Sequence, residues 1–137
     1  MIDYFSATLP DDELRAMSSI GLAHLGDAVY ELLVRTYLCV HGKATGKGLH
    51  RATVALVCAP KQAELSEKIL PLLTEEERDV FRRGRNANVH TIPHSAERAE
   101  YRKATALEAL LGYLYLRGEK ERVNELFAVM MEGTDVT

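Results

Sequence analysis

The feature that most constrains this chain is an apolar segment, residues 104–116, that contains a single charge, Glu108. A helix that is apolar on every side belongs in the interior of a fold. A glutamate is rarely buried without a partner, because removal from water disfavours its ionised form. Two interpretations therefore stay open. Glu108 either lies at an exposed edge or beside an arginine, or it is held in a site that binds a cation.

A second unusual carboxylate lies in a mostly apolar stretch nearer the N-terminus. Residues 21–40 contain three formal charges, spaced four residues apart: Asp27, Glu31 and Arg35. On a helix this spacing gives one polar stripe, along which Glu31 and Arg35 can pair whereas Asp27 and Glu31 repel. A solvated stripe therefore explains Glu31 and Arg35 well, and Asp27 less well.

Each of these two carboxylates has a glycine nearby. Gly26 precedes Asp27, and Gly112 follows Glu108 by one helical turn. Glycine inside a helix costs about 1 kcal/mol relative to alanine, but it lets another backbone approach closely. Two carboxylates converging from packed helices suit Mg²⁺, which prefers oxygen ligands and can activate water against a phosphodiester.

The hydrophobic pattern predicts an all-α fold, with about seven helices in a single domain over residues 1–137. One long helix should begin at a cap formed by Ser18 or Ser19 and end at Gly42. Its expected core stripe consists of Leu22, Leu25, Val29, Leu32, Leu33, Thr36 and Val40.

Start and stop signals predict the later helices. Thr74 followed by Glu77 is a capping-box pattern, and the helix that it begins should stop at Gly84. The apolar segment should belong to a helix that ends before Gly118. Residues 42–48 and 86–96 have the composition of loops.

Composition excludes several classes of protein. A net charge of −3 and a pI of about 6.0 argue against a protein that coats nucleic acid through bulk charge. Bases are nevertheless concentrated in residues 41–61 and 78–103, which could meet in one patch. Two cysteines make no disulfide framework, no run is long enough to span a membrane, and the N-terminus is unlike a signal peptide. We therefore expect a cytoplasmic protein.

Two motifs resemble those of a known family. Residues 24–32, HLGDAVYEL, resemble the signature helix of ribonuclease III, and residues 107–116, LEALLGYLYL, resemble its second motif. Their order and separation also fit. Two features narrow the resemblance: we find no double-stranded-RNA-binding domain, and residues 83–86 read RGRN. The chain therefore resembles Mini-III, the compact branch that consists of a catalytic domain alone, over nearly its whole length.

The resemblance implies a ribonuclease III-like helical domain that acts as a homodimer. It also implies Mg²⁺-dependent cleavage of double-stranded RNA, with 5′-phosphate and 3′-hydroxyl products and precursor large-subunit ribosomal RNA as the substrate class. Asp27 and Glu108 match the family's catalytic, metal-binding positions. A ribosomal protein or a pre-ribosomal particle is a further candidate partner. The alternative function is a ribonuclease III-like dimer that binds structured RNA without cutting it.

The chain departs from full-length ribonuclease III at two acidic positions, which are Ala23 and Thr105 here. These departures fit the narrower branch and leave the number of metal ions open. The Thr105 hydroxyl has two possible roles: it holds a water on the metal, or it bonds to the preceding helical turn.

Six residues are candidate RNA contacts. Arginine forks match phosphate geometry, although arginines at a helix end also complement the helix dipole. The resemblance favours RNA contact. The candidates are Lys47, Arg51, Arg82, Arg83, Arg85 and Asn86.

The helix around residues 24–30 is apolar on more than one face, which predicts a dimer interface along it. The expected contacts include Ala23, His24 and Ala28. Two sites related by a two-fold axis would cut both strands of a duplex.

Overall fold

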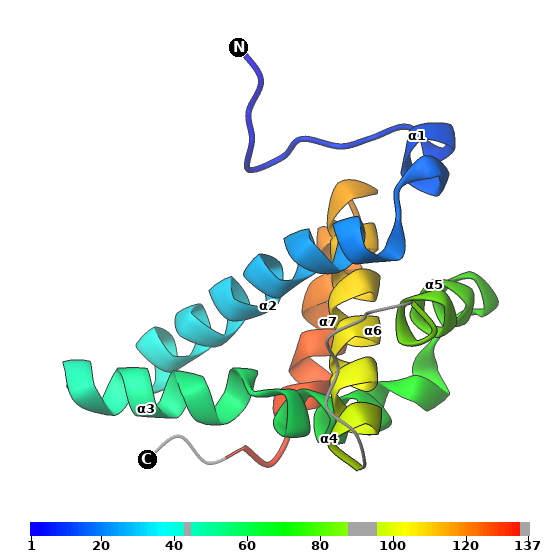
Figure 1. Ribbon diagram of the computed structural model, residues 1–137. Coiled ribbons are helices and arrows are strands. Elements are labelled where there is room, and N and C mark those ends of the chain that lie inside the picture. Colours follow the sequence, from blue (N-terminus) through cyan, green and yellow to red (C-terminus); the bar gives the residue numbers. More distant parts are fainter. Residues whose placement is uncertain (43–44, 88–95, 135–137) are drawn as a thin grey trace.

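The protein folds into helices in the part of the chain that its computed structural model describes, which is residues 1–42, 45–87 and 96–134 (Figure 1). The all-α prediction is confirmed. The elements, in chain order, are α1 (Asp11–Ala16), α2 (Ser19–His41), α3 (Gly46–Val57), α4 (Ala59–Ile69), a 3-10 turn η1 (Leu70–Leu72), α5 (Glu75–Arg85), α6 (Ala96–Leu116) and α7 (Lys120–Met131).

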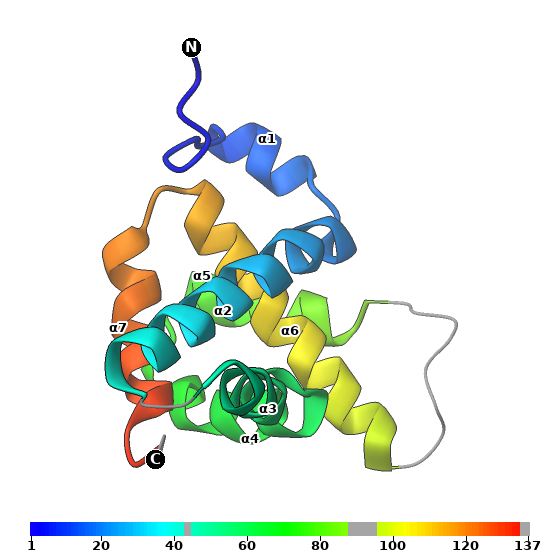
Figure 2. The ribbon, with the colours of Figure 1, turned by 90° about the vertical axis from the view of Figure 1, so that its left-hand side faces the viewer.

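Helix α6 is the centre of the fold. It packs against α2, α4, α5 and α7, and its most extensive contact is with α2. Figure 2 shows α2 crossing α6, with α7 on one side of the crossing and α5 behind it. Leu107, Leu110 and Leu111 are fully buried. The apolar segment is therefore an interior helix, as its composition predicts.

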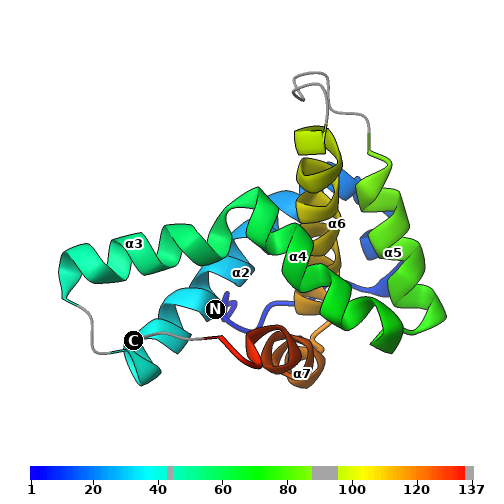
Figure 3. The ribbon, with the colours of Figure 1, turned by 90° about the horizontal axis from the view of Figure 1, so that it is seen from below.

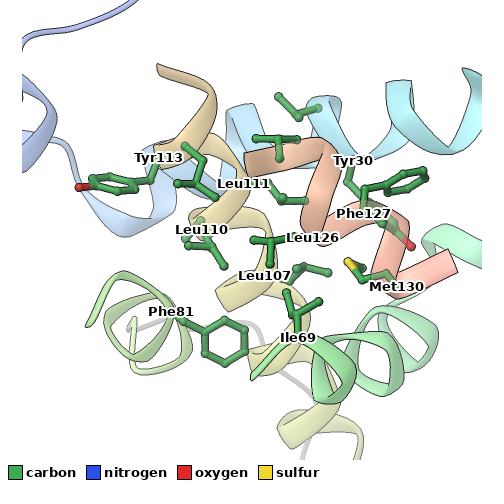
Figure 4. Close-up of a cluster of buried hydrophobic side chains, with 14 of the residues drawn as sticks. Tyr30, Ile69, Phe81, Leu107, Leu110, Leu111, Tyr113, Leu126, Phe127 and Met130 are labelled. Atoms are coloured by element: carbon green, nitrogen blue, oxygen red, sulfur yellow. The ribbon is translucent and has the colours of Figure 1, made fainter. Parts of the chain in front are cut away.

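The hydrophobic core surrounds α6 and takes large side chains from four other helices (Figure 4). Tyr30 comes from α2, Ile69 from α4, Phe81 from α5, and Phe127 and Met130 from α7. All are buried, and Tyr30 and Phe127 meet edge to face with ring centroids 6.3 Å apart. Helix α6 is therefore held in place by packing contacts with four other helices along its length.

Three of the predicted helix boundaries are confirmed. The Ser18 hydroxyl accepts a hydrogen bond from the Gly21 amide at 3.0 Å. Thr74 and Glu77 form the reciprocal capping box, with bonds of 3.2 and 2.9 Å. Gly118 has a φ of 83°, a left-handed conformation that ends α6 and that glycine adopts without strain.

The predicted core stripe of α2 was partly wrong. Leu32 and Val40 are 59% and 70% exposed, and Thr36 is exposed as well. Tyr30, Val34 and Leu38 are buried in their place. The face of α2 that packs on α6 contains Gly26, which lies against the backbone of α6. Because glycine has no side chain, this face is not apparent from the hydrophobic pattern.

Two further boundaries differ from expectation. Gly84 does not stop α5; it lies inside the helix, where an added Cβ would come within 2.9 Å of the Ala109 side chain. Its missing side chain lets α5 pack closely on α6. Helix α3 begins at Gly46, inside the predicted loop at 42–48. Of the predicted loop at 86–96, residues 88–95 lie outside the described residues. None of the described helices has the length and apolarity needed to cross a lipid bilayer.

Candidate active site

The site is built on a very close crossing of α2 and α6 at two glycines. A Cβ added to Gly26 would lie 1.6 Å from the carbonyl oxygen of Glu108, and one added to Gly112 would lie 2.1 Å from that of Leu22. Both obstacles are backbone atoms, so no side chain can move aside. Glycine is therefore required at both positions, and the close approach predicted from the sequence is confirmed.

This crossing brings the two candidate carboxylates together. Asp27 is exposed on α2, whereas Glu108 is partly buried on α6. Burial, together with the hydrogen-bonding contact and negative charge of Asp27, raises the pKa of Glu108 to about 8, while the hydrogen bond from Gln62 acts in the opposite direction. The interpretation in which an arginine pairs with Glu108 fails. No ion pair joins Glu108 to a basic residue in the described residues.

Gln62 on α4 is a third member of the site that the sequence argument missed. Its Nε2 donates to Glu108 Oε2 at 3.3 Å and to the carbonyl oxygen of Val57 at 2.8 Å. The residue is only 2% exposed. A sequence signal did exist, because Gln62 shares the buried face of α4 with Ser66 and Ile69, where a polar side chain is unusual.

The pair has the chemistry of a site for a hard cation. Two carboxylates in contact repel when both are ionised, and a bound cation removes that repulsion. Carboxylate oxygens are the protein ligands that Mg²⁺ takes, usually one or two of them with water completing the shell. No cluster of three or more acidic, histidine or cysteine side chains suited to a metal occurs among the described residues. Asp27 and Glu108 therefore fit a site with few protein ligands.

The two departures from the full acidic pattern both lie in packed surroundings. Ala23 is buried, and so is Thr105. The Thr105 hydroxyl donates to the Tyr101 carbonyl oxygen at 3.1 Å, one turn earlier on α6. Of the two roles considered for Thr105, the structure contains the bond to the preceding turn.

The arginines of α5 lie in its last turn, and Asn86 follows as the C-cap. Arg82 and Arg83 are both paired with Asp79 on the same helix, with Arg83 Nε 3.1 Å from Asp79 Oδ2. Arg85 is exposed at the helix end. Because Gly84 packs on α6 beside Thr105, this end of α5 lies one turn from Glu108 along α6.

Lys47 and Arg51 lie elsewhere. Both are exposed on α3, and Figures 1 and 3 show α3 and α5 on opposite sides of α6. Within one copy of the described chain, Lys47 and Arg51 therefore lie apart from the arginines at the end of α5.

The outward face of α2 is partly as expected for an interface. His24 and Ala28 are exposed beside Asp27, and Leu32 continues the same face. Ala23, which we expected to be an interface contact, is instead 7% exposed and belongs to the core of its own chain. The sequence pattern could not separate Ala23 from the outward positions, because small and apolar residues occur on both faces of α2.

Comparison with known proteins gives a consistent result. The Ribonuclease III domain family matches residues 21–119. A Mini-ribonuclease 3 of Symbiobacterium thermophilum is 50% identical over 107 residues, 78% of this chain and 82% of the relative. A Mini-ribonuclease 3 of Thermoanaerobacter sp. is 43% identical over 124 residues, 90% of this chain and 87% of the relative.

A crystal structure of a protein from Fusobacterium nucleatum superposes with a TM-score of 0.78 at 33% identity, covering 88% of this chain and 97% of that one. The residues matched by the family, 21–119, include both Asp27 and Glu108. The chain belongs to the ribonuclease III family of endoribonucleases, and within it to the Mini-ribonuclease 3 branch.

Proposed function

We propose that the protein is a Mg²⁺-dependent endoribonuclease that cleaves double-stranded RNA at a site formed by Asp27 and Glu108. The observation that carries this proposal is the carboxylate pair held at the Gly26–Gly112 crossing. The Mini-ribonuclease 3 relatives support the reaction class. The products that fit this chemistry are a 5′-phosphate and a 3′-hydroxyl end.

Each residue of the site has a separate task in this proposal. Asp27 and Glu108 would hold the cation, which when bound stabilises charge on the phosphate and supports attack by water. Asp27 faces solvent and so is open to a phosphate from outside, whereas Glu108 lies deeper and is tied to α4 through Gln62. The close approach of α2 and α6 at Gly26 and Gly112 would hold the two carboxylates side by side.

We further propose that the enzyme acts as a homodimer. One site cuts one strand, so a duplex cut on both strands needs two sites. The exposed face of α2 with His24, Ala28 and Leu32 lies directly beside Asp27. A two-fold contact along this face would place both sites near the interface. Light scattering of the purified protein should then give about twice 15.3 kDa.

RNA contact is proposed for the end of α5 and for α3. Arg85 and Asn86 lie at the end of α5 nearer the carboxylates, whereas Arg82 and Arg83 would exchange Asp79 for phosphate. Lys47 and Arg51 belong to α3, which lies on the opposite side of α6 from α5, so they do not extend that surface in one copy. In a dimer, a long duplex could reach α3 of either copy.

The test is incubation of the pure protein with duplex RNA in Mg²⁺, compared with binding in Ca²⁺. Asp27→Asn and Glu108→Gln should each abolish cleavage and leave RNA binding intact, because each keeps the side-chain shape and removes the charge. Glu31→Gln is the matched control: Glu31 lies one turn after Asp27 on α2 but pairs with Arg35 at 2.8 Å.

Cleavage by either carboxylate variant at the wild-type rate would refute the site. Binding without cleavage by the wild-type protein would favour the alternative, a dimer that binds structured RNA without cutting it.

The proposed natural substrate is precursor large-subunit ribosomal RNA. A paired stem of that precursor, offered beside an unrelated duplex of equal length, should be cut faster and at fixed positions. If bare precursor is cut no better than the control duplex, the same comparison with a ribosomal protein or pre-ribosomal particle tests whether a partner presents the RNA.

A further inference from the structure

Gln62 contacts the carboxylate pair from a third helix, although it is neither acidic nor exposed. It is the fourth residue of α4, and helical side chains lean toward the N-terminus of their helix. Its amide therefore reaches back beyond the start of α4 to the carbonyl oxygen of Val57 at 2.8 Å. The same nitrogen lies 3.3 Å from Glu108 Oε2.

The neighbours of the amide determine its orientation. The Val57 carbonyl oxygen and Glu108 Oε2 both accept hydrogen bonds, so the group that faces them is the NH₂ of Gln62. Its Oε1 is buried and has no hydrogen-bond partner in the described residues. An unpaired buried acceptor costs about 1–3 kcal/mol. Methionine would fill a similar volume without that cost, so packing alone does not account for an amide here.

The backbone that holds Gln62 also holds the helix of Asp27. The carbonyl oxygen of Leu56, next to that of Val57, accepts a hydrogen bond from the Tyr30 hydroxyl at 2.7 Å. Tyr30 is fully buried and follows Asp27 on α2 by about one turn. Two successive carbonyl oxygens at the end of α3 thus anchor α2 on one side and the Gln62–Glu108 contact on the other.

We infer that Gln62 is a positioning residue of the metal site, whose amide fixes the rotamer of Glu108 by tying one carboxylate oxygen to the α3–α4 junction. The inference rests on the proposed function, because it assumes that Asp27 and Glu108 bind the cation. Partners that orient a metal ligand typically change metal affinity or activity about 10–100-fold when they are removed. Gln62 achieves this without adding a charge to the site.

The test is Gln62→Met, which keeps the length of the side chain and removes the amide. Mn²⁺ affinity is measured by electron paramagnetic resonance in the absence of RNA. We expect about a 10–100-fold loss of Mn²⁺ affinity. The rate constant for cleavage at saturating RNA should fall, while KM and duplex binding in Ca²⁺ stay within about twofold of wild type. Ser66→Ala is the control, because Ser66 is fully buried on the same face of α4 and its hydroxyl donates to the Ala63 carbonyl oxygen of its own helix.

Each other outcome is decisive. Wild-type Mn²⁺ affinity in a folded Gln62→Met variant overturns this inference and leaves the proposed function standing. A wild-type protein that binds no Mn²⁺ overturns both.

If Gln62→Met does not fold, wild-type protein labelled with ¹⁵N decides. The Gln62 side-chain amide signals should shift on titration with Mg²⁺ and should not shift in Glu108→Gln. Signals that stay constant up to saturating Mg²⁺ overturn the inference.

Discussion

Replacement of Gly26 by alanine should destabilise the fold, although a sequence-based argument predicts the opposite sign. Alanine is favoured over glycine inside a helix by about 1 kcal/mol. At this position, however, the new Cβ would lie 1.6 Å from the Glu108 carbonyl oxygen, against an ordinary contact of at least 3.4 Å. Because the obstacle is the backbone of α6, the two helices must move apart by roughly the difference, about 1.5–2 Å, which loosens the core around them.

The expected magnitude follows from these opposing effects. Overpacking in a core costs about 1–3 kcal/mol when side chains can adjust, and occasionally more. Movement of a whole helix belongs at or above the upper end, so we expect a cost of about 3–4 kcal/mol. After subtraction of the helix-propensity gain of about 1 kcal/mol, Gly26→Ala should lower the free energy of unfolding by about 2–3 kcal/mol.

The assay is equilibrium unfolding in urea, followed by circular dichroism at one fixed protein concentration. Gly46→Ala is the matched control, because an added Cβ there meets none of the described residues within 4 Å and should leave stability unchanged or slightly higher. Separation of α2 and α6 also displaces Asp27 from Glu108, and a displacement of about 1 Å can cost about 100-fold in rate. A Gly26→Ala variant as stable and as active as wild type would refute the close-contact argument.

Three further outcomes are expected. Metal-free protein should lose stability as the pH rises from about 4.5 to about 8, because folded Glu108 keeps a proton that the unfolded chain releases. In a series of thermal melts, Glu108→Gln should remove this dependence of stability on pH, and saturating Mg²⁺ should reduce it. The Arg122 guanidinium lowers the pKa of Glu77, so this ion pair stabilises the protein at neutral pH. The stabilisation is lost as the pH falls below about 4.5, and Glu77→Gln should reduce this loss of stability at low pH in the same melts. Arg83→Ala and Arg85→Ala should each weaken duplex RNA binding in Ca²⁺ regardless of sequence and reduce the salt slope by about one unit, whereas an unchanged slope would assign them to the helix end alone.

Local signals in the sequence predicted much of the fold. The capping box at Thr74 and Glu77, the Ser18 cap and the glycine at 118 each act within a few residues, so they can be recognised without knowledge of the tertiary structure. The interior position of α6 was equally accessible, because a helix that is apolar on all sides has few other places to go.

The errors arose where tertiary contact decides between local alternatives. Apolar residues occur on both faces of α2, with Leu32 exposed and Val34 buried. The face that packs on α6 is marked by Gly26, which has no hydrophobic side chain. Gly84 has the local character of a helix stop, but α5 continues through it because α6 fills the space where a side chain would be. A glycine therefore marks either an end or a contact, and the partner helix decides which.

The same contact explains why the carboxylates could be recognised from the sequence and Gln62 could not. Asp27 and Glu108 are charges in apolar surroundings, and their cost is visible in the chain itself. Gln62 carries no charge, and its role exists only because α4 places its amide against a residue 46 positions away. The structure adds an energetic consequence. The crossing that brings the two carboxylates together also raises the pKa of Glu108, so under the proposed function the metal-free fold carries a penalty that cation binding would remove. On that proposal, stability of the α2–α6 crossing and affinity for the metal would be linked through the same two helices.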